Sequence, residues 1–264
     1  MAKPVVVLVG ADKGGVGKTT VSRTLLDYLA ARKIPTRAFD TEWPRGTLKR
    51  FHPDITEVVD VTSVPDQMKI FDTLESSSAS VTLIDVRAGI MSSTLNALRN
   101  IGFLDAGKKG QLTFALFHIL GSSIASLDEI AETSHYLTDA KYFLVKNFIN
   151  NTSFFEWDQA TYNSYFKQFK DAVEITIPQL SEMAYEQVEL VATPFTNFIA
   201  NKGANGMPAN HSFVLRGYVR HWLENVWSEF DRVKFLDLVG VREGAAAGDA
   251  TKPRLMKLAE AAAH

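Results

Sequence analysis

A glycine-rich stretch near the N-terminus constrains the fold of this chain more than any other feature. It follows the apolar run from Val5 to Val9 and reads Lys13-Gly14-Gly15-Val16-Gly17-Lys18-Thr19-Thr20. A strand that ends in a glycine turn and continues into a helix directs several backbone N–H groups and the helix N-terminus at one point. That arrangement binds anions, so the stretch predicts a polyphosphate-binding loop between the first strand and the first helix.

The loop departs from the ordinary P-loop pattern at one position. In G-x-x-x-x-G-K-[ST] the first glycine lies five positions before the second, and Asp12 stands there in this chain. A lysine directly precedes the glycine pair instead, in the order K-G-G-x-G-K-T, and this order resembles the deviant Walker A box of the ParA/MinD family of ATPases. The resemblance implies a homodimer around ATP, in which Lys13 reaches the phosphates of the nucleotide bound by the partner subunit.

The residue types in the loop suit a magnesium nucleotide. The three glycines permit backbone dihedrals and a close approach to phosphate oxygens that side chains would forbid. Lys18 is expected over the β- and γ-phosphates, and the Thr19 hydroxyl is expected to bind Mg²⁺. We therefore predict that residues Lys13 to Thr20 bind ATP and Mg²⁺. The alternative is a glycine turn that binds nothing.

Two other predicted strands end in carboxylates. Asp85 follows the apolar run Val81 to Ile84 and resembles the Walker B aspartate of the family, which implies a role in binding Mg²⁺. Asp40 follows Thr36 to Phe39, and the resemblance implies that it handles Mg²⁺-bound water. Glu42 stands at the second carboxylate of that family motif and is predicted to act in hydrolysis. A strand-ending aspartate that only caps a helix is the alternative.

Two positions near these carboxylates differ from the family pattern. Arg87 replaces the usual proline after the Walker B aspartate, and a cation there could stabilise the transition state or contact a partner. Trp43 is inserted before Pro44, and we expect it to pack against the fold or to contact a second subunit.

The base of the nucleotide is expected at the carboxyl ends of later strands, because ligands of open parallel sheets bind in that crevice. Asn147 ends the run from Phe143 and resembles the family asparagine that recognises adenine. Pro178 follows Ile175 to Ile177 and resembles the segment that lines the base pocket. Taken alone, an asparagine after a strand is more typical of a turn, so both roles stay open for Asn147.

Short apolar runs alternate with helical patterns along the chain, which indicates an α/β fold with a mostly parallel, doubly wound sheet and helices on both faces. The resemblance implies a P-loop NTPase of the SIMIBI kind. Apolar residues make up 46% of the 264 residues, enough for a large core. We expect one ATPase domain over residues 1–243 and a flexible or short helical tail over residues 244–264, where Gly, Ala and Pro253 suggest a linker.

Seven strands and seven helices are expected from these patterns. The strands are predicted at 4–9, 36–39, 58–61, 80–84, 113–119, 141–147 and 172–177. The helices are predicted at 18–31, 66–76, 93–101, 123–137, 154–169, 183–192 and 211–233. His118 is alone in an apolar strand and is expected to be a structural residue with satisfied hydrogen bonds.

Composition limits the partners and the compartment. A net charge of −2 gives no overall basic field for nucleic acid. A local stripe of Lys202, Arg216 and Arg220 is predicted to bind DNA nonspecifically, with an ordinary solvated helix face as the alternative. The chain has no Cys, which excludes disulfides and thiolate metal sites. No leader and no stretch of ~20 apolar residues is visible, so a soluble cytoplasmic protein is expected.

Three uses of an ATP-dependent dimer follow from the resemblance. The preferred one is plasmid or chromosome partitioning, in which the dimer binds DNA and an adaptor protein triggers hydrolysis. The second is membrane positioning as in the MinD branch, for which 252–258 is a weak amphipathic pattern. The third is a metabolic synthetase or kinase, whose acceptor pocket would fall in the aromatic-rich segment 154–169, although core packing explains that segment better.

Overall fold

The chain forms a seven-stranded sheet with the strand order β3-β2-β4-β1-β5-β6-β7. Every neighbouring pair of strands is parallel. The computed structural model describes residues 3–134, 136, 140–149, 152–156, 158–166 and 172–240. The strands are β1 (Val5–Gly10), β2 (Thr36–Asp40), β3 (Thr56–Val58), β4 (Val81–Asp85), β5 (Thr113–Leu120), β6 (Lys141–Asn147) and β7 (Val173–Ile177).

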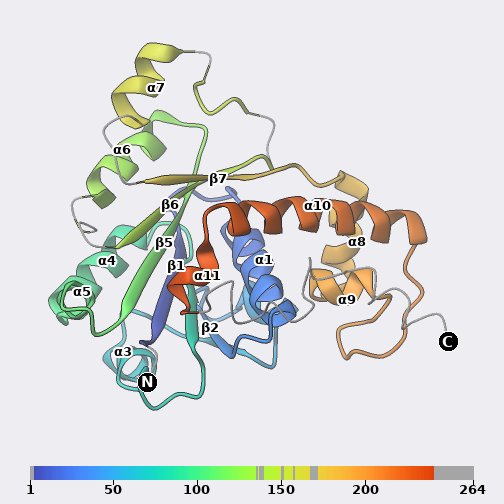
Figure 1. Cartoon of the computed structure of the whole chain (residues 1–264), viewed down its shortest axis with the longest axis horizontal. Coiled ribbons are helices and arrows are strands. Elements are labelled where there is room, and N and C mark those ends of the chain that lie inside the picture. The colour runs from blue at the N-terminus through green and yellow to red at the C-terminus, as the bar shows by residue number, and fades with distance from the viewer. Residues whose placement is uncertain are drawn as a thin grey trace.

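Helices cover both faces of this sheet (Figure 1). They are α1 (Lys18–Ala31), α2 (Thr47–Phe51), α3 (Val64–Phe71), α4 (Met91–Asn100), α5 (Phe103–Lys108), α6 (Ile124–Ser134), α7 (Gln159–Phe166), α8 (Glu182–Val191), α9 (Phe195–Ile199), α10 (Phe213–Arg232) and α11 (Phe235–Leu238). The predicted α/β fold with a parallel, doubly wound sheet is therefore confirmed.

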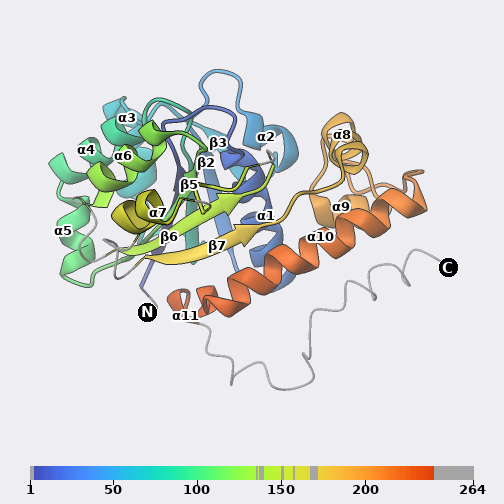
Figure 2. The ribbon, with the colours of Figure 1, turned by 90° about the horizontal axis from the view of Figure 1, so that it is seen from above.

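Two hydrophobic cores lie on the two faces of the sheet. Successive side chains of a strand point to opposite faces, so Val5, Val7 and Val9 of β1 belong to one core while Val6 and Leu8 belong to the other. The first core is closed by α1 and by α8 to α11, and the second by α3 to α6. Figure 2 shows these two groups of helices on either side of the sheet, with α10 extending past the sheet toward α8 and α9.

The strand order brings three loops together at the carboxyl edge of the sheet. In the register of the parallel pairs, Asp85 of β4 lies opposite Val9 of β1 on one side and opposite Asp40 of β2 on the other. The loops that follow β1, β2 and β4 consequently leave the sheet side by side. Residues far apart in the sequence thus meet at a single place, next to the glycine-rich loop.

Six of the seven predicted strands overlap the observed ones closely, whereas the third was predicted at 58–61 and β3 shares only Val58 with that range. The short helices α2, α5, α9 and α11 were not predicted, because four to six residues are too few to show a helical period. The helix predicted from residue 154 begins at Gln159 instead. Phe154 and Phe155 have φ values of 46° and 63°, which a right-handed helix does not allow.

Several predictions fall partly or wholly outside the described residues. The tail 244–264, including the amphipathic pattern at 252–258, is outside them, as are Trp157 and residues 167–169 of the aromatic-rich segment. Phe154 of that segment is buried in the second core, in line with a packing role. None of the helices in the described ranges has the length and apolar character needed to cross a membrane.

Candidate functional site

The glycine-rich loop joins β1 to α1 and folds tightly over the start of the helix. Gly15 and Gly17 have φ values of 74° and 87°, in the left-handed region that favours glycine. A Cβ atom on Gly17 would also lie 2.1 Å from the Nδ2 atom of Asn147. Lys18 begins α1 and its Nζ donates to the carbonyl oxygen of Lys13 at 2.8 Å. Burial lowers the pKa of Lys18, with nearby carboxylates acting in the opposite direction.

A cavity of about 410 Å³, here called the phosphate cavity, lies against this loop. The loops after β2 and β4, together with Ile149 and Tyr185, form its other walls. It brings together most of the residues predicted for the phosphates and the metal. The predicted residues that line it are Gly14, Gly15, Gly17, Lys18, Thr19, Thr20, Asp40, Glu42 and Asp85.

Asp85 lies at the floor of the phosphate cavity and is held by two hydroxyl groups. Thr19 Oγ1 donates to one carboxylate oxygen and Ser22 Oγ donates to the other, both at 2.8 Å. Burial raises the pKa of Asp85 to about 7, and the charge of Asp40 adds to that rise. Ser22 was not predicted, although it lies three positions after Thr19 and hence on the same face of α1.

Asp40 anchors the loop between β2 and α2. Its Oδ1 accepts from the backbone N–H of Glu42 at 2.9 Å, and its Oδ2 accepts from those of Leu48 at 2.6 Å and Lys49 at 3.2 Å. It therefore satisfies backbone donors at the start of α2, and burial raises the pKa of its carboxyl group. Glu42 accepts from the hydroxyl of Thr47, which also lines the phosphate cavity.

Asp12 accounts for the departure from the ordinary P-loop pattern. Its carboxylate accepts from the backbone N–H of Met91 at 2.7 Å and from Ser92 Oγ at 2.8 Å, so it caps the N-terminus of α4. A glycine at position 12 could make neither bond. The backbone N–H of Asp12 donates to Glu129 at 2.6 Å, which ties the loop to α6 as well.

His118 lies behind this contact, and the expectation that its hydrogen bonds are all satisfied is wrong for Nε2, which is buried without a hydrogen-bond partner. Its Nδ1 is 2.7 Å from the hydroxyl of Tyr142, and its Nε2 is 3.2 Å from Glu129. The histidine is fully buried. It thus connects β5 and β6 to the carboxylate that holds the glycine-rich loop.

Lys13 is exposed and does not line the phosphate cavity. It lines a separate opening of about 460 Å³, here called the Lys13 cavity, on the α6 side of the loop. The other lining residues are Asp12, Ser123, Ala125, Ser126, Asp128, Glu129 and Glu132. Within its own chain, the Lys13 side chain therefore lies apart from Lys18 and Thr19.

A third opening, of about 300 Å³, adjoins the phosphate cavity and is here called the base cavity. The two share Thr20, Ile149 and Tyr185 as walls. The remaining residues of the base cavity are Asn147, Pro178, Gln179, Leu180, Glu182 and Trp222. The predicted base residues Asn147 and Pro178 are thus brought together, while Tyr185 and Trp222 were missed because their positions depend on the packing of α8 and α10.

The side chain of Asn147 is already engaged with the glycine-rich loop. Its Nδ2 donates to the carbonyl oxygen of Val16 at 3.0 Å, and its Oδ1 accepts from the backbone N–H of Ile149 at 3.2 Å. This amide therefore supports the loop from below, between the phosphate and base cavities. Whether it also recognises adenine stays a prediction.

The predicted basic stripe is only partly exposed. Arg216 and Arg220 are each only partly exposed, and the Nε atoms of both are buried without a hydrogen-bond partner. Arg216 donates to the carbonyl oxygen of Ile199 at 3.3 Å. Lys202 alone among the three is exposed. Binding of DNA by these three residues stays a prediction.

The expectation that Trp43 packs against the fold is wrong, because its side chain is 60% exposed; contact with a second subunit stays a prediction.

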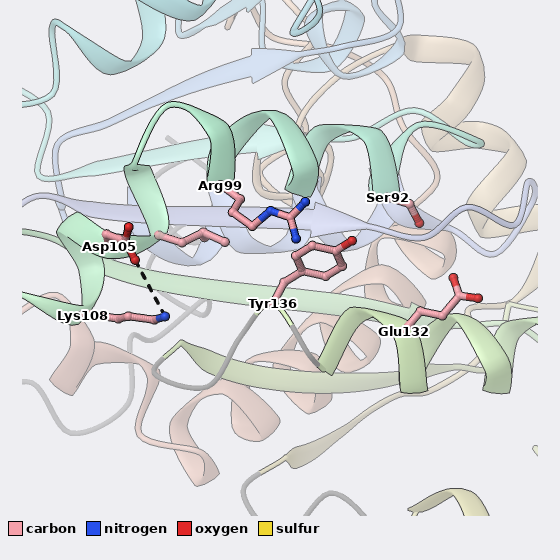
Figure 3. Close-up of a pocket in the computed structure, with 7 residues that line it drawn as sticks. Ser92, Arg99, Asp105, Lys108, Glu132 and Tyr136 are labelled. Carbon is pink, nitrogen blue, oxygen red and sulfur yellow. Dashed lines mark ion pairs between the residues drawn. The ribbon is translucent and has the colours of Figure 1, made fainter.

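An opening larger than the phosphate cavity lies away from the loop, between α4, α5 and α6 (Figure 3). This α4–α6 cavity measures about 570 Å³ and is lined by Ser92, Arg99, Leu104, Asp105, Lys108, Glu132 and Tyr136. Its charged groups interact locally: Lys108 lies 3.8 Å from Asp105, and the guanidinium of Arg99 lies over the ring of Tyr136.

Comparisons with known proteins give similarities of fold. No protein-family model matches the chain, and no curated protein matches its sequence. A nucleotide-binding protein from Archaeoglobus fulgidus, solved in complex with ADP, is 14% identical, with 70% of this chain and 86% of that chain covered and a TM-score of 0.46. A chain of the MinC:MinD cell division protein complex from Aquifex aeolicus is 12% identical, with 84% and 96% covered and a TM-score of 0.45.

Proposed function

We propose that this chain binds ATP with Mg²⁺ and hydrolyses it, acting as a switch that dimerises while ATP is bound. The phosphate cavity carries the proposal. It combines a glycine-rich loop at the N-terminus of α1 with a buried lysine and three carboxylates from the ends of β2 and β4. Backbone N–H groups and a lysine suit the phosphates, while the carboxylates suit a divalent cation and a reacting water.

The donors in the phosphate cavity fit a magnesium ion bound through the nucleotide. Mg²⁺ prefers oxygen ligands and uses one or two protein groups together with phosphates and waters. The Thr19 hydroxyl, the Asp85 carboxylate and the Asp40 carboxylate are the oxygens available beside the loop. When bound, the ion would neutralise charge on the β- and γ-phosphates.

Three residues of the phosphate cavity have separate proposed roles toward the phosphates, the water and the loop. Lys18 would exchange the carbonyl oxygen of Lys13 for oxygens of the β- and γ-phosphates. Glu42 lies at the wall of the phosphate cavity, where its carboxylate would orient the attacking water. Asp40 would hold the β2–α2 loop in place through the start of α2, in addition to the role predicted for it toward metal-bound water.

The base would occupy the base cavity. Its shared walls with the phosphate cavity allow one ligand to extend through both. Pro178 and Trp222 give it apolar surface, and the Nε1 of Trp222 is bonded to the carbonyl oxygen of Pro178 at 2.6 Å, which orients both. Adenine is the base that we propose, from the resemblance.

The proposal for the dimer rests on Lys13. This lysine is exposed and lines a different cavity from the one proposed for the phosphates of its own chain, which supports a role toward nucleotide in a second subunit. Plasmid or DNA partitioning or positioning is the use that we propose for the dimer, with an adaptor protein and nonspecific DNA as partners. Its support is the resemblance in the loop, together with the exposed Lys202.

Calorimetry of the full chain with ATP, ADP and GTP, each with and without Mg²⁺, tests the nucleotide site. We expect saturable heat with MgATP and weaker heat without Mg²⁺. The absence of heat with adenine and guanine triphosphates would contradict the proposal. ATPase and binding assays with and without duplex DNA or anionic vesicles then test the proposed role in DNA partitioning. DNA binding should require ATP and should weaken steeply as the salt concentration rises.

Analytical ultracentrifugation tests the dimer. Lys13→Ala should bind ATP normally and stay monomeric, while Lys109→Ala, which removes an exposed lysine beyond the end of α5, should dimerise with ATP like the native chain. Dimerisation of Lys13→Ala with ATP would refute the role of Lys13 toward a second subunit.

A further inference from the structure

A second cation lines the phosphate cavity besides Lys18. Arg87 follows Asp85 by two residues, in the loop after β4, and is exposed. The charged groups that line the cavity are these two cations and the carboxylates of Asp40, Glu42 and Asp85. Positive charge is thus scarce where a polyphosphate would bind, so each cation has a large electrostatic effect.

The backbone that carries Arg87 is fixed at both ends of its loop. The N–H of Arg87 donates to Thr41 Oγ1 at 2.8 Å, and the N–H of Gly89 donates to the carbonyl oxygen of Asp12 at 2.9 Å. Thr41 is itself buried, and its N–H donates to the carbonyl oxygen of Asp85 at 3.0 Å. Arg87 therefore has a rigid base between the glycine-rich loop and the β2–α2 loop.

The guanidinium at the other end of this side chain is uncommitted. Within the described part of the chain, it makes neither a hydrogen bond nor an ion pair. Arg87 is close enough to Asp60 to affect its pKa. Hydrogen bonds from Thr62 are the main reason why the pKa of Asp60 is lowered, and the positive charge of Arg87 lowers it by a smaller amount. Because hydrogen bonds hold its backbone and its guanidinium has none in the described residues, Arg87 can contact negative charge that develops in the phosphate cavity.

We propose that Arg87 is a catalytic residue that contacts the γ-phosphoryl group in the transition state, from the same chain that binds the nucleotide. The inference rests on the proposed function. In hydrolysis, a water oxygen forms a bond to the γ-phosphorus as the bond to the β,γ-bridging oxygen breaks, and the electron pair of that bond leaves with ADP. The water contributes one proton to the phosphate product and releases the other to solvent.

Charge shifts onto the bridging and γ-phosphoryl oxygens during this step. A planar guanidinium can donate two hydrogen bonds to such oxygens, whereas an ammonium acts as a point charge. An arginine supplied by the same chain has this effect in other nucleotide hydrolases. Arg87 is placed for it because it shares the cavity with Lys18 and Asp85.

Single-turnover hydrolysis and transition-state analogue binding test the inference in the full chain. Arg87→Ala should hydrolyse bound ATP about 10²-fold more slowly than the native chain, with its Kd for ATP changed by less than about threefold. Its affinity for MgADP with aluminium fluoride should fall by a similar factor to the rate. Added guanidinium should restore part of the rate, and Arg87→Lys should remain slow because lysine lacks the planar fork.

Arg45→Ala is the matched control, since Arg45 is exposed on the neighbouring β2–α2 loop and does not line the phosphate cavity. It should behave like the native chain in every assay. An unchanged hydrolysis rate and unchanged analogue affinity for Arg87→Ala would overturn the inference. A loss of ATP-dependent dimerisation with unchanged analogue affinity would also overturn it, in favour of a contact with a second subunit. Failure of the native chain to bind ATP would instead refute the proposed function itself.

Discussion

The phosphate cavity and the α4–α6 cavity differ in how their charged groups are held. The α4–α6 cavity is the larger, at about 570 Å³ against about 410 Å³. Its charged side chains, drawn in Figure 3, include Asp105 and Lys108. The side chain of Asp105 is 66% exposed and that of Lys108 is 48% exposed. In the phosphate cavity, by contrast, three of the five charged residues are buried, since Asp40, Asp85 and Lys18 are only 1%, 4% and 8% exposed; Glu42 is partly exposed and Arg87 is exposed.

Volume alone therefore does not distinguish the phosphate cavity from the α4–α6 cavity as a binding site. Burying a charged group costs free energy unless hydrogen bonds and opposite charges compensate. Hydrogen bonds offset this free energy at the ends of β4 and β2. Two hydroxyl groups donate to Asp85, and backbone N–H groups donate to Asp40. Exposed charges impose no such requirement. We propose that the buried, compensated charge beside the glycine-rich loop, rather than cavity volume, marks the nucleotide site, and the following experiments test that contrast.

The largest effect is expected from Lys18→Ala. Removing the buried ammonium should weaken ATP binding by about 10³-fold, because charge-assisted contacts to the phosphates are lost and the carboxylates around it repel the ligand more strongly. Calorimetry measures the change. Lys108→Ala removes a lysine of the α4–α6 cavity and should leave the affinity unchanged. Equal losses in the two variants would remove the contrast between the cavities.

The stability of the folded chain should decrease as pH rises from about 4 to about 7. Burial raises the pKa of Asp85 from 3.8 to about 7, so over this range the folded state keeps a proton that the unfolded state releases. The free energy of unfolding then falls by at most about 1.4 kcal/mol per pH unit for this group. Chemical denaturation at several pH values measures it.

Asp85→Asn is the variant that isolates this effect. It should flatten the decrease, since asparagine carries no titrating proton. Part of the slope should remain because burial also raises the pKa of Asp27, to about 6, with the same sign. A slope as steep in Asp85→Asn as in the native chain would show that Asp85 is not the group responsible.

Asp12→Gly restores the ordinary P-loop pattern and should have an intermediate effect. The substitution leaves the backbone N–H of Met91 and the hydroxyl of Ser92 without their acceptor, so the free energy of unfolding should fall by about 1–3 kcal/mol. ATP affinity should change by less than about threefold, because the backbone contacts of the loop are retained. Asp105→Ala is the matched control from the α4–α6 cavity and should be nearly neutral. A stability of Asp12→Gly equal to that of the native chain would contradict the capping role.

The smallest effect is expected from Arg99→Ala. Arg99 is exposed. Its guanidinium donates a hydrogen bond to Asn96 Oδ1 and lies over the ring of Tyr136, and both contacts are at the surface. Thermal and chemical unfolding should change by less than about 0.5 kcal/mol, and ATP affinity should not change. A large loss of ATP affinity would instead connect the α4–α6 cavity to the nucleotide site.

Much of the fold could be read from local patterns. Six of the seven strands followed from apolar runs, and α1 followed from the spacing of Val21, Leu25 and Leu29 after the glycine-rich loop. The short helix α2 could not be predicted, because its start depends on hydrogen bonds from Leu48 and Lys49 to Asp40, eight and nine residues away. The partial burial of Arg216 likewise depends on α9 packing against α10.

The sequence by itself determined the loop, the strands that flank it and the carboxylates that end two of them, because strand periodicity and glycine dihedrals are local properties of the chain. Only the tertiary structure decided which groups face the same space. It placed the side chains of Lys13 and Lys18 in different cavities, brought Arg87 into the cavity of Lys18 and engaged Asn147 with Val16. The physical reason is that cavities and hydrogen bonds between distant segments depend on strand order and helix packing, which no short stretch of sequence specifies.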